Sequence, residues 1–237
     1  MRDLRIATRP REGGMPHKVV AIDGPAGAGK TTVARALAAR LGYVVLPSGT
    51  FYRALAWQAL EAGTPLDDEA ALARLADATE IDVHVGAEGQ CVARVNGRDV
   101  SDALGSSAVG DAASRVSVFP EVRRRLVELQ RHFAADCPVV AEGRDMASVV
   151  FPNAEHKFYL DATVGERARR RGLDLRERGE EADPARLAAD LAARDQRDSS
   201  RQAAPLRLVE GAVRVDTTGL SVPEVVERLL RTMGLRP

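Results

Sequence analysis

The chain has 237 residues, 45% of them hydrophobic and 29% charged, which is enough to bury the core of one globular domain. Its 34 basic and 34 acidic residues balance, so charge gives no reason to expect nucleic acid or a membrane as a partner. No apolar run has the length of a membrane span or signal peptide. Two distant cysteines form no metal or disulfide pattern, and a reducing, cytoplasmic location is expected.

The first third of the chain alternates between strand and helix patterns. Residues 1–17 lack periodicity and are expected to be a disordered tail before a domain at 18–237. The apolar run 19–22 predicts a buried strand, and an apolar stripe that ends at Gly42 predicts the helix after it. A second strand at 44–46 and a second helix at 51–60 follow.

The middle of the chain interrupts this alternation. After a helix at 67–78, the segment 84–95 and the Asn96-Gly97 turn indicate a small antiparallel hairpin. Two helices are expected between Ser101 and Phe133. Residues of about 64–118 are therefore expected to form an insert outside the main sheet.

The last third returns to strands and helices. Apolar runs at 138–141, 157–160 and 213–215 predict three more strands. Thr163 with Glu166, and Ser221 with Glu224, are spaced as capping boxes that begin helices. Residues 184–201 form another predicted helix. Five short apolar strands separated by helices predict an α/β fold, with a five-stranded parallel sheet flanked by helices and a small α+β insert.

The strongest motif lies between the first strand and its helix. Residues 24–31 read Gly-Pro-Ala-Gly-Ala-Gly-Lys-Thr and fit G-x-x-x-x-G-K-[ST]. In such a loop backbone N–H groups surround a phosphate at a helix N-terminus. Lys30 would reach the β- and γ-phosphates, and the Thr31 hydroxyl would bind Mg²⁺. A glycine-rich turn without a ligand is the alternative.

Two other classes of nucleotide-binding protein fit less well. A GTPase switch needs an NKxD motif, and the nearest strings, at 96–99 and 216–219, are a hairpin turn and a strand end. A motor or AAA-type ATPase needs an apolar strand that ends in Asp-Glu, and the strand before Glu142-Gly143 lacks that pair. A kinase of a small molecule fits a short chain with an arginine cluster.

Three further charged patterns leave alternatives open. Six arginines within 165–178 suit either a solvated helix face or a lid that closes over the transferred phosphoryl group. The stripe Leu187, Leu191, Arg194, Asp198 and Arg201 turns from apolar to charged, so its helix either leaves the core for solvent or points into a phosphate-binding cleft. Arg144 and Asp145 follow the third main strand and form either a surface ion pair or part of the crevice near Lys30.

Five segments, in this order and spacing, resemble bacterial cytidylate kinases. They are IDGPAGAGKTT (22–32), LPSGTFYRALA (46–56), AEGRDMASVVFP (141–152), ERARRR (166–171) and ARDQRDSSR (193–201). The resemblance covers the chain from about Val19 to its end. It implies a nucleoside monophosphate kinase that converts ATP and CMP or dCMP into ADP and CDP or dCDP with Mg²⁺. It also implies a fold of the P-loop NTP hydrolase type, in which the α+β insert at about 64–118 binds the monophosphate and a mobile helical lid lies at about 166–200.

The resemblance also implies roles for residues at matching positions. The ATP-binding residues would be Gly24, Pro25, Ala26, Gly27, Ala28, Gly29, Lys30, Thr31 and Thr32. The residues along the acceptor site would be Ser48, Tyr52 and Arg53, with Arg53, Arg144 and Arg201 as phosphate ligands. The cytosine-reading residues would be Ser114, Arg123 and Asp145. The ribose-contacting residues would be Arg194 and Asp198, and the catalytic cations Lys30, Arg144, Arg170 and Arg201. Periodicity alone does not select Arg123, which could equally lie on the surface.

Chemistry fits this assignment. A phosphate monoester has its second pKa near ~6, so the acceptor is already an anion and needs no general base. The chain departs from the family at Pro47, where an Asp is usual, and at Leu104-Gly105-Ser106, where Ile-Arg-Thr is usual. Alternatives are a kinase of another acceptor, with Asp145 as base if that acceptor is a hydroxyl, and a nucleotide-binding switch. The family suggests a monomer.

Overall fold

The computed structural model describes residues 18–86, 90–135, 137–177, 179 and 183–235. The tail expected at 1–17 and Arg178 of the arginine cluster lie outside the described residues. The chain divides into two compact units. The core unit combines Lys18–Val45 with Val139–Pro237, and the inserted unit is Leu46–Pro138, a range that contains the expected insert.

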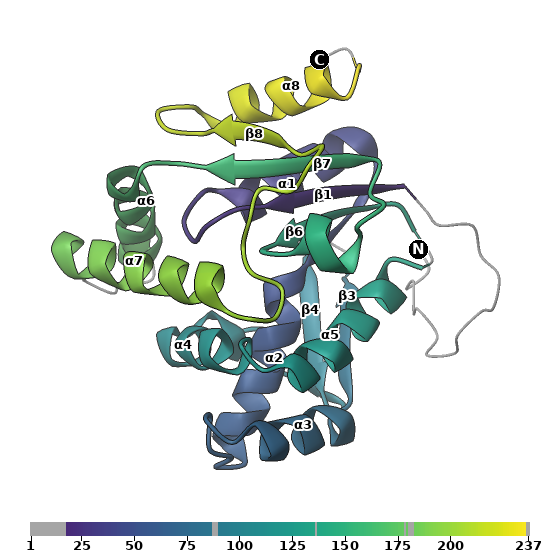
Figure 1. Cartoon of the computed structure of the whole chain (residues 1–237), viewed down its shortest axis with the longest axis vertical. Coiled ribbons are helices and arrows are strands. Elements are labelled where there is room, and N and C mark those ends of the chain that lie inside the picture. The colour runs from purple at the N-terminus through teal and green to yellow at the C-terminus, as the bar shows by residue number, and fades with distance from the viewer. Residues whose placement is uncertain (1–17, 87–89, 136, 178, 180–182, 236–237) are drawn as a thin grey trace. The chain divides into compact units, whose positions relative to one another are not determined.

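A five-stranded sheet forms the centre of the core unit (Figure 1). Its strands are β1 (Val19–Asp23), β2 (Val44–Pro47), β6 (Val139–Gly143), β7 (His156–Asp161) and β8 (Val213–Asp216). They lie in the order β2-β6-β1-β7-β8, and β1 pairs in parallel with both β6 and β7. Strand β1 has a neighbouring strand on each side and is buried on both faces, which is why its apolar run does not alternate with polar residues. The five-stranded parallel sheet predicted from the sequence is confirmed.

Two helices pack together in the main core of this unit. Helix α1 (Lys30–Leu41) ends at Gly42 as predicted, and α8 (Val222–Thr232) contacts it. The apolar face of α8 is buried through Val225, Val226, Leu229 and Leu230. The capping box predicted at its N-terminus is present, so the local sequence alone determines where this helix begins.

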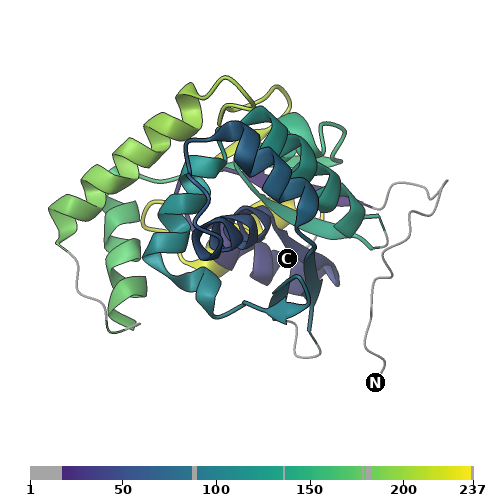
Figure 2. The same ribbon diagram turned by 90° about the horizontal axis from the view of Figure 1, so that it is seen from below.

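Helices α6 (Val164–Glu177) and α7 (Pro184–Ser200) lie side by side (Figure 2). The predicted capping box before α6 is only half correct. The Thr163 hydroxyl accepts a bond from the Glu166 amide, but the Glu166 carboxylate binds Arg169 and Arg170 instead of returning to Thr163. The Thr163 amide donates to Thr218 Oγ1, so a tertiary contact replaces the local one.

The inserted unit combines four helices with a small sheet. The helices are α2 (Ser48–Glu61), α3 (Glu69–Ala78), α4 (Ser107–Val116) and α5 (Pro120–Phe133). The strands β3 (Ile81–Val85) and β4 (Cys91–Val95) form the expected antiparallel pair. The Asn96-Gly97 turn joins β4 to a third strand, β5 (Arg98–Asp99), which the sequence did not predict because it has only two residues. Phe51 and Phe133 pack edge to face between α2 and α5.

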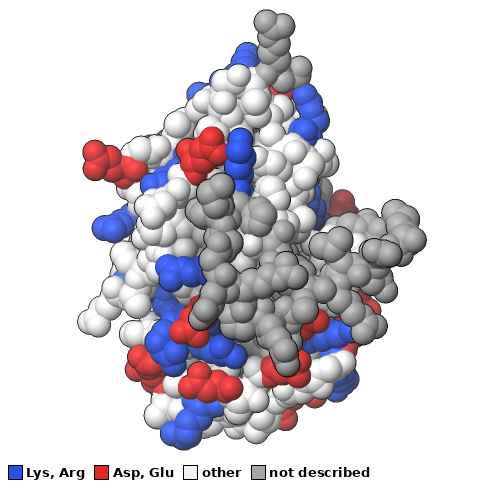
Figure 3. All heavy atoms as spheres, turned by 90° about the vertical axis from the view of Figure 1, so that its right-hand side faces the viewer, with Lys and Arg blue, Asp and Glu red and all other residues white. Residues whose placement is uncertain are grey.

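The surface carries both charge signs. On the face in Figure 3, basic and acidic side chains lie next to one another rather than in a patch of one sign, in line with the balanced totals. Among the described residues, no helix is both long and apolar enough to cross a membrane.

Candidate functional site

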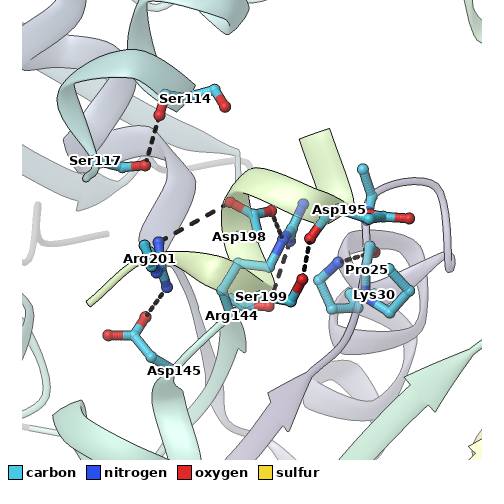
Figure 4. A network of polar contacts seen from close by, with 12 residues as sticks. Pro25, Lys30, Ser114, Ser117, Arg144, Asp145, Asp195, Asp198, Ser199 and Arg201 are labelled. Atoms are coloured by element: carbon cyan, nitrogen blue, oxygen red, sulfur yellow. Dashed lines mark hydrogen bonds and ion pairs between the residues drawn. The ribbon is translucent and has the colours of Figure 1, made fainter. Parts of the chain in front are cut away.

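The phosphate loop joins β1 to α1, as its motif predicts. Gly24 has φ +150°, and a Cβ there would lie 2.0 Å from the backbone oxygen of Leu160 on β7. Only glycine fits this position. The Lys30 side chain is 5% exposed and donates to the backbone oxygen of Pro25 at 2.7 Å, so it lies back across the loop (Figure 4).

The Lys30 ammonium is held in an environment that disfavours its charge. Burial and the nearby guanidinium of Arg144 lower its pKa to about 7. Glu142 acts in the opposite direction. A polyanion bound in the loop would therefore favour the charged form of this ammonium.

Glu142 is a site residue that the sequence analysis missed. It lies near the end of β6, directly beside β1, and its carboxylate accepts a bond from Thr31 Oγ1 at 2.9 Å. A hydroxyl and a carboxylate oxygen next to a phosphate loop are the hard donors that Mg²⁺ prefers. The search for an Asp-Glu pair passed over this lone acid. The strand order that brings it to the loop cannot be inferred from the motif.

Charged residues from the end of β6 and from α7 meet in a buried network (Figure 4). Arg144 Nε donates to Asp198 Oδ2 at 2.8 Å. Arg201 lies 4.0 Å from carboxylate oxygens of both Asp198 and Asp145 and donates to the backbone oxygen of Ala204. The charged end of the stripe is buried, with Asp198 5% and Arg201 8% exposed, so α7 does not leave the core for solvent.

The Asp198 carboxylate stays ionised in this network. Burial alone would raise its pKa, but Arg144 and Arg194 outweigh burial, and the pKa lies below its usual value. Excess guanidinium charge around one carboxylate is suited to an anionic ligand.

A second buried carboxylate, Asp23 at the end of β1, shapes the same edge of the sheet. Its two oxygens accept the backbone N–H groups of Met146 and Ala147, each at 2.8 Å. These residues begin the π-helical turn Met146–Val150 that directly follows Arg144 and Asp145. Burial raises the Asp23 pKa to about 6, although both bonds oppose this. Sequence reasoning did not single out Asp23.

The arginines of α6 do not share one environment. Arg169 is exposed, whereas Arg167 is buried. Arg170 is fixed by Glu166 and by Thr217, donating to the Thr217 hydroxyl at 3.0 Å and to its backbone oxygen at 2.7 Å. A pocket of about 420 Å³ lies between the phosphate loop, this part of α6 and the turn from β8 to α8. Its apolar wall there consists of Leu220, Val222 and Val225.

The inserted unit holds the other candidate residues. Arg123 on α5 is 4% exposed, donates to the backbone oxygen of Ser117 at 3.0 Å and lies 5.4 Å over the Tyr52 ring. It is not a surface residue. The buried Ser114 hydroxyl has no hydrogen-bond partner in the described part of the chain. Ser48 is buried in the first turn of α2.

Arg53 lies in the same unit as Pro47 and Leu104-Gly105-Ser106, the two places where the chain departs from the family. Arg53 donates to the backbone oxygen of Leu104 and packs against Gly110, 3.3 Å from the Cβ a side chain would place there. Pro47 is the last residue of β2 and precedes α2 directly. Gly105 ends the short 3₁₀ turn that begins at Ala103.

The sheet, the phosphate loop and the buried cations beside it define a P-loop protein equipped for nucleotide-dependent phosphoryl transfer. A family model described as cytidylate kinase matches residues 20–234. The chain belongs to the cytidylate kinase family.

Individual relatives agree with this assignment. The cytidylate kinase of Symbiobacterium thermophilum is 47% identical over 92% of this chain and 96% of its own length. That of Pasteurella multocida is 44% identical over 90% of this chain and 93% of its own. A crystal structure of an uncharacterized protein from Eubacterium ventriosum shares the fold, with a TM-score of 0.52 and 10% identity over 93% of this chain and 100% of that one.

Proposed function

We propose that this protein transfers the γ-phosphoryl group of ATP to CMP or dCMP. The observation that carries the proposal is the buried cluster at the carboxyl edge of the sheet. There the phosphate-loop lysine, a hydroxyl–carboxylate pair and the Arg144–Asp198–Arg201 network belong to one unit. Such a set neutralises phosphate charge, and no histidine is needed.

The donor is proposed to bind in the pocket over the phosphate loop. The loop N–H groups from Gly27 to Thr32 would bind its phosphates, and Lys30 would turn from Pro25 toward them. The nucleoside would lie against the apolar wall at the β8–α8 turn. Thr31 and Glu142 are the residues that would hold Mg²⁺, which would supply positive charge to offset that of the phosphates.

The transfer itself would rest on positioning and charge. The acceptor phosphate is a nucleophile without deprotonation, so no side chain has to act as base. Arg144 and Arg201 are proposed to hold it, and Arg170 to stabilise the charge that spreads over the transferred group. Arg170 would do so as part of the lid, proposed at about 166–200.

The proposed acceptor contacts are those that the family resemblance implies. Arg123 would donate to the acceptor atoms of cytosine, and Ser114 and Asp145 would accept from its amine. The buried Ser114 hydroxyl, which has no hydrogen-bond partner among the residues that the structure describes, supports this, since a ligand would satisfy a group that is otherwise costly to bury. Uracil reverses two of these groups and would be rejected.

The rest of the acceptor is proposed to contact other residues. Arg194 and Asp198 would contact the ribose. Ser48, Tyr52 and Arg53 would line the monophosphate side.

The protein is further proposed to act as a monomer in the cytoplasm, without nucleic acid or membrane as partner. Balanced charge and mixed surface signs support the last point.

The test is ADP release from ATP and Mg²⁺ with CMP, dCMP, UMP, AMP or GMP as acceptor, beside a control without acceptor. Turnover confined to the two cytidine nucleotides is expected, and it would also show that Pro47 and Gly105 are tolerated. Turnover with a different monophosphate would overturn the roles of Ser114, Arg123 and Asp145. Hydrolysis independent of any acceptor would favour a nucleotide switch.

A further inference from the structure

The backbone of Ala26 in the phosphate loop is held by two helices that lie far away in the sequence. The backbone oxygen of Ala26 accepts a bond from Arg167 on α6 at 3.1 Å. Its N–H donates to Asp195 on α7, at a longer 3.4 Å. Arg167, which is buried, and Asp195, which is half-buried, form an ion pair with each other, so the two contacts close a ring around Ala26. Arg167 is 5% exposed and is also fixed to the backbone oxygen of Ala162.

Apolar packing holds the same point of the loop. The side chain of Ala26 belongs to a buried cluster whose other members all come from α6 and α7. They are Ala168, Leu175, Leu187 and Leu191. The next residue, Gly27, has φ +76°, and a Cβ there would lie 3.0 Å from Arg167 Cβ. The loop backbone therefore touches α6 without room for a side chain between them.

A glycine-rich loop needs such support. It binds phosphate only when several N–H groups point to one centre, and glycines leave the free chain many other conformations. Hydrogen bonds within the loop give little of this support, because the bond from Lys30 to the Pro25 backbone oxygen is one that the ligand would displace. The Arg167–Asp195 pair binds both backbone polar groups of Ala26 and so orients the two peptide units that meet at this residue.

We propose that Arg167 and Asp195 are positioning residues that hold the phosphate loop in its phosphate-binding conformation. This rests on the proposed function of the loop as the donor site and goes beyond it, since neither residue is assigned a substrate contact. Because Ala26 binds both helices, the start of α6 up to Arg167 and the end of α7 from Asp195 onward would move together with the loop. Motion of the lid would then be confined to the parts of α6 after Arg167 and of α7 before Asp195. An ion pair removed from most of its solvent adds little net stability over apolar residues of similar volume, which makes a purely structural role the weaker explanation.

The first test is Asp195→Ala in the full chain, with Asp190→Ala as control, because Asp190 lies on the same helix and is exposed. The affinity for ATP and for inorganic tripolyphosphate, measured by calorimetry, is expected to fall about tenfold. The KM for CMP should stay within about twofold. Adenosine, which lacks phosphates, should bind as it does to the unmodified protein. Asp190→Ala should match the unmodified protein in all four measurements.

Asp195→Ala leaves the Arg167 charge buried and can unfold the protein, so a second variant is needed. Arg167→Met with Asp195→Leu removes both charges and keeps volume in the cluster. It is expected to recover the thermal midpoint while tripolyphosphate affinity stays low. Recovery of that affinity together with stability would overturn the proposal, as would an equal loss for CMP and ATP. Because tripolyphosphate binding requires no acceptor, this result is independent of which monophosphate the enzyme uses.

Discussion

The two units treat their buried polar groups differently. In the core unit, buried cations near the phosphate loop have carboxylate or backbone partners on another element, as Arg144 has Asp198 and Arg167 has Asp195. In the inserted unit, the buried Ser114 hydroxyl and the Gln130 amide group have no hydrogen-bond partner among the described residues. Gln130 is fully buried.

This contrast shows which buried polar groups have partners within the described chain and which would gain a partner from a ligand. Paired charges keep these side chains of the core unit in one arrangement, at the cost of desolvation. An unpartnered buried hydroxyl or amide costs about 1–3 kcal/mol, which a ligand or a water molecule can recover. The inserted unit should therefore gain more from acceptor binding than the core unit does.

The largest effect is expected from Lys30→Ala, which removes the central cation of the donor side. Turnover should fall by about a thousandfold or more, because no other group replaces its charge on the phosphates. The thermal midpoint should not fall, since burial already disfavours this ammonium. ADP release and thermal unfolding measure the two quantities. Lys18→Ala, at an exposed lysine, is the control, and near-normal activity in Lys30→Ala would contradict the phosphate-loop assignment.

Arg123→Met addresses the acceptor side and keeps most of the side-chain volume. We expect kcat/KM for CMP to fall about a hundredfold and the KM for ATP to change by less than about twofold. Steady-state kinetics with each substrate varied in turn gives both values. Arg124→Met, at the next and exposed position of α5, should change neither. An equal loss for both substrates would exclude a base-reading role for Arg123.

Ser114→Ala sharpens the contrast between paired and unpartnered groups. Removing a hydroxyl without a partner should leave the free energy of unfolding unchanged or raise it by about 1 kcal/mol. The preference for CMP over UMP should fall about tenfold. The matched control is Ser117→Ala, because that hydroxyl donates to the Ser114 backbone oxygen at 2.9 Å. It should lose about 1 kcal/mol of stability and keep the preference.

The smallest effect concerns Glu166, whose pKa is lowered to about 2 mainly by its hydrogen bond from Arg169, and further by that from Arg170. Its ionised form is favoured in the folded state. The stability it contributes is therefore complete above its unfolded pKa, near 4.5, and is lost as the pH falls toward 2. Solvent screening limits it to about 1 kcal/mol. Urea unfolding of Glu166→Gln beside the unmodified protein should show a difference at pH 6 that narrows by pH 3. A difference independent of pH would exclude the ion pairs as its cause.

Local sequence predicted most of the fold. Apolar runs found all five strands of the main sheet, and Ser221 with Glu224 located the start of α8 exactly where the side chains cap it. The same reasoning was half wrong at Thr163, because Thr218, which is distant in sequence, supplies the competing partner. The pattern within one helix or strand can be predicted from the sequence, whereas contacts that depend on the order of the strands in the sheet cannot.

The candidate site divides along the same line. The motif alone located Lys30 and Thr31. Glu142 and Asp23 act through neighbours that only the sheet order brings close, so no spacing rule could select them. The stripe on α7 was recognised from its spacing. Whether its charged end points to solvent or toward the core depends on packing, which periodicity does not show. The burial of Arg123 was likewise invisible, since it flanks the apolar face of its helix.

The close approach at Gly24 affects how a mutational scan of this protein would be interpreted. Every substitution there would drive a Cβ into the Leu160 peptide, so activity would vanish for alanine as completely as for tryptophan. The profile would look like that of a residue that handles substrate, although the cause is that two backbones meet. Soluble expression, measured beside activity, would separate the two: Gly24 variants should be depleted from the folded pool, whereas variants of Lys30 should accumulate in it.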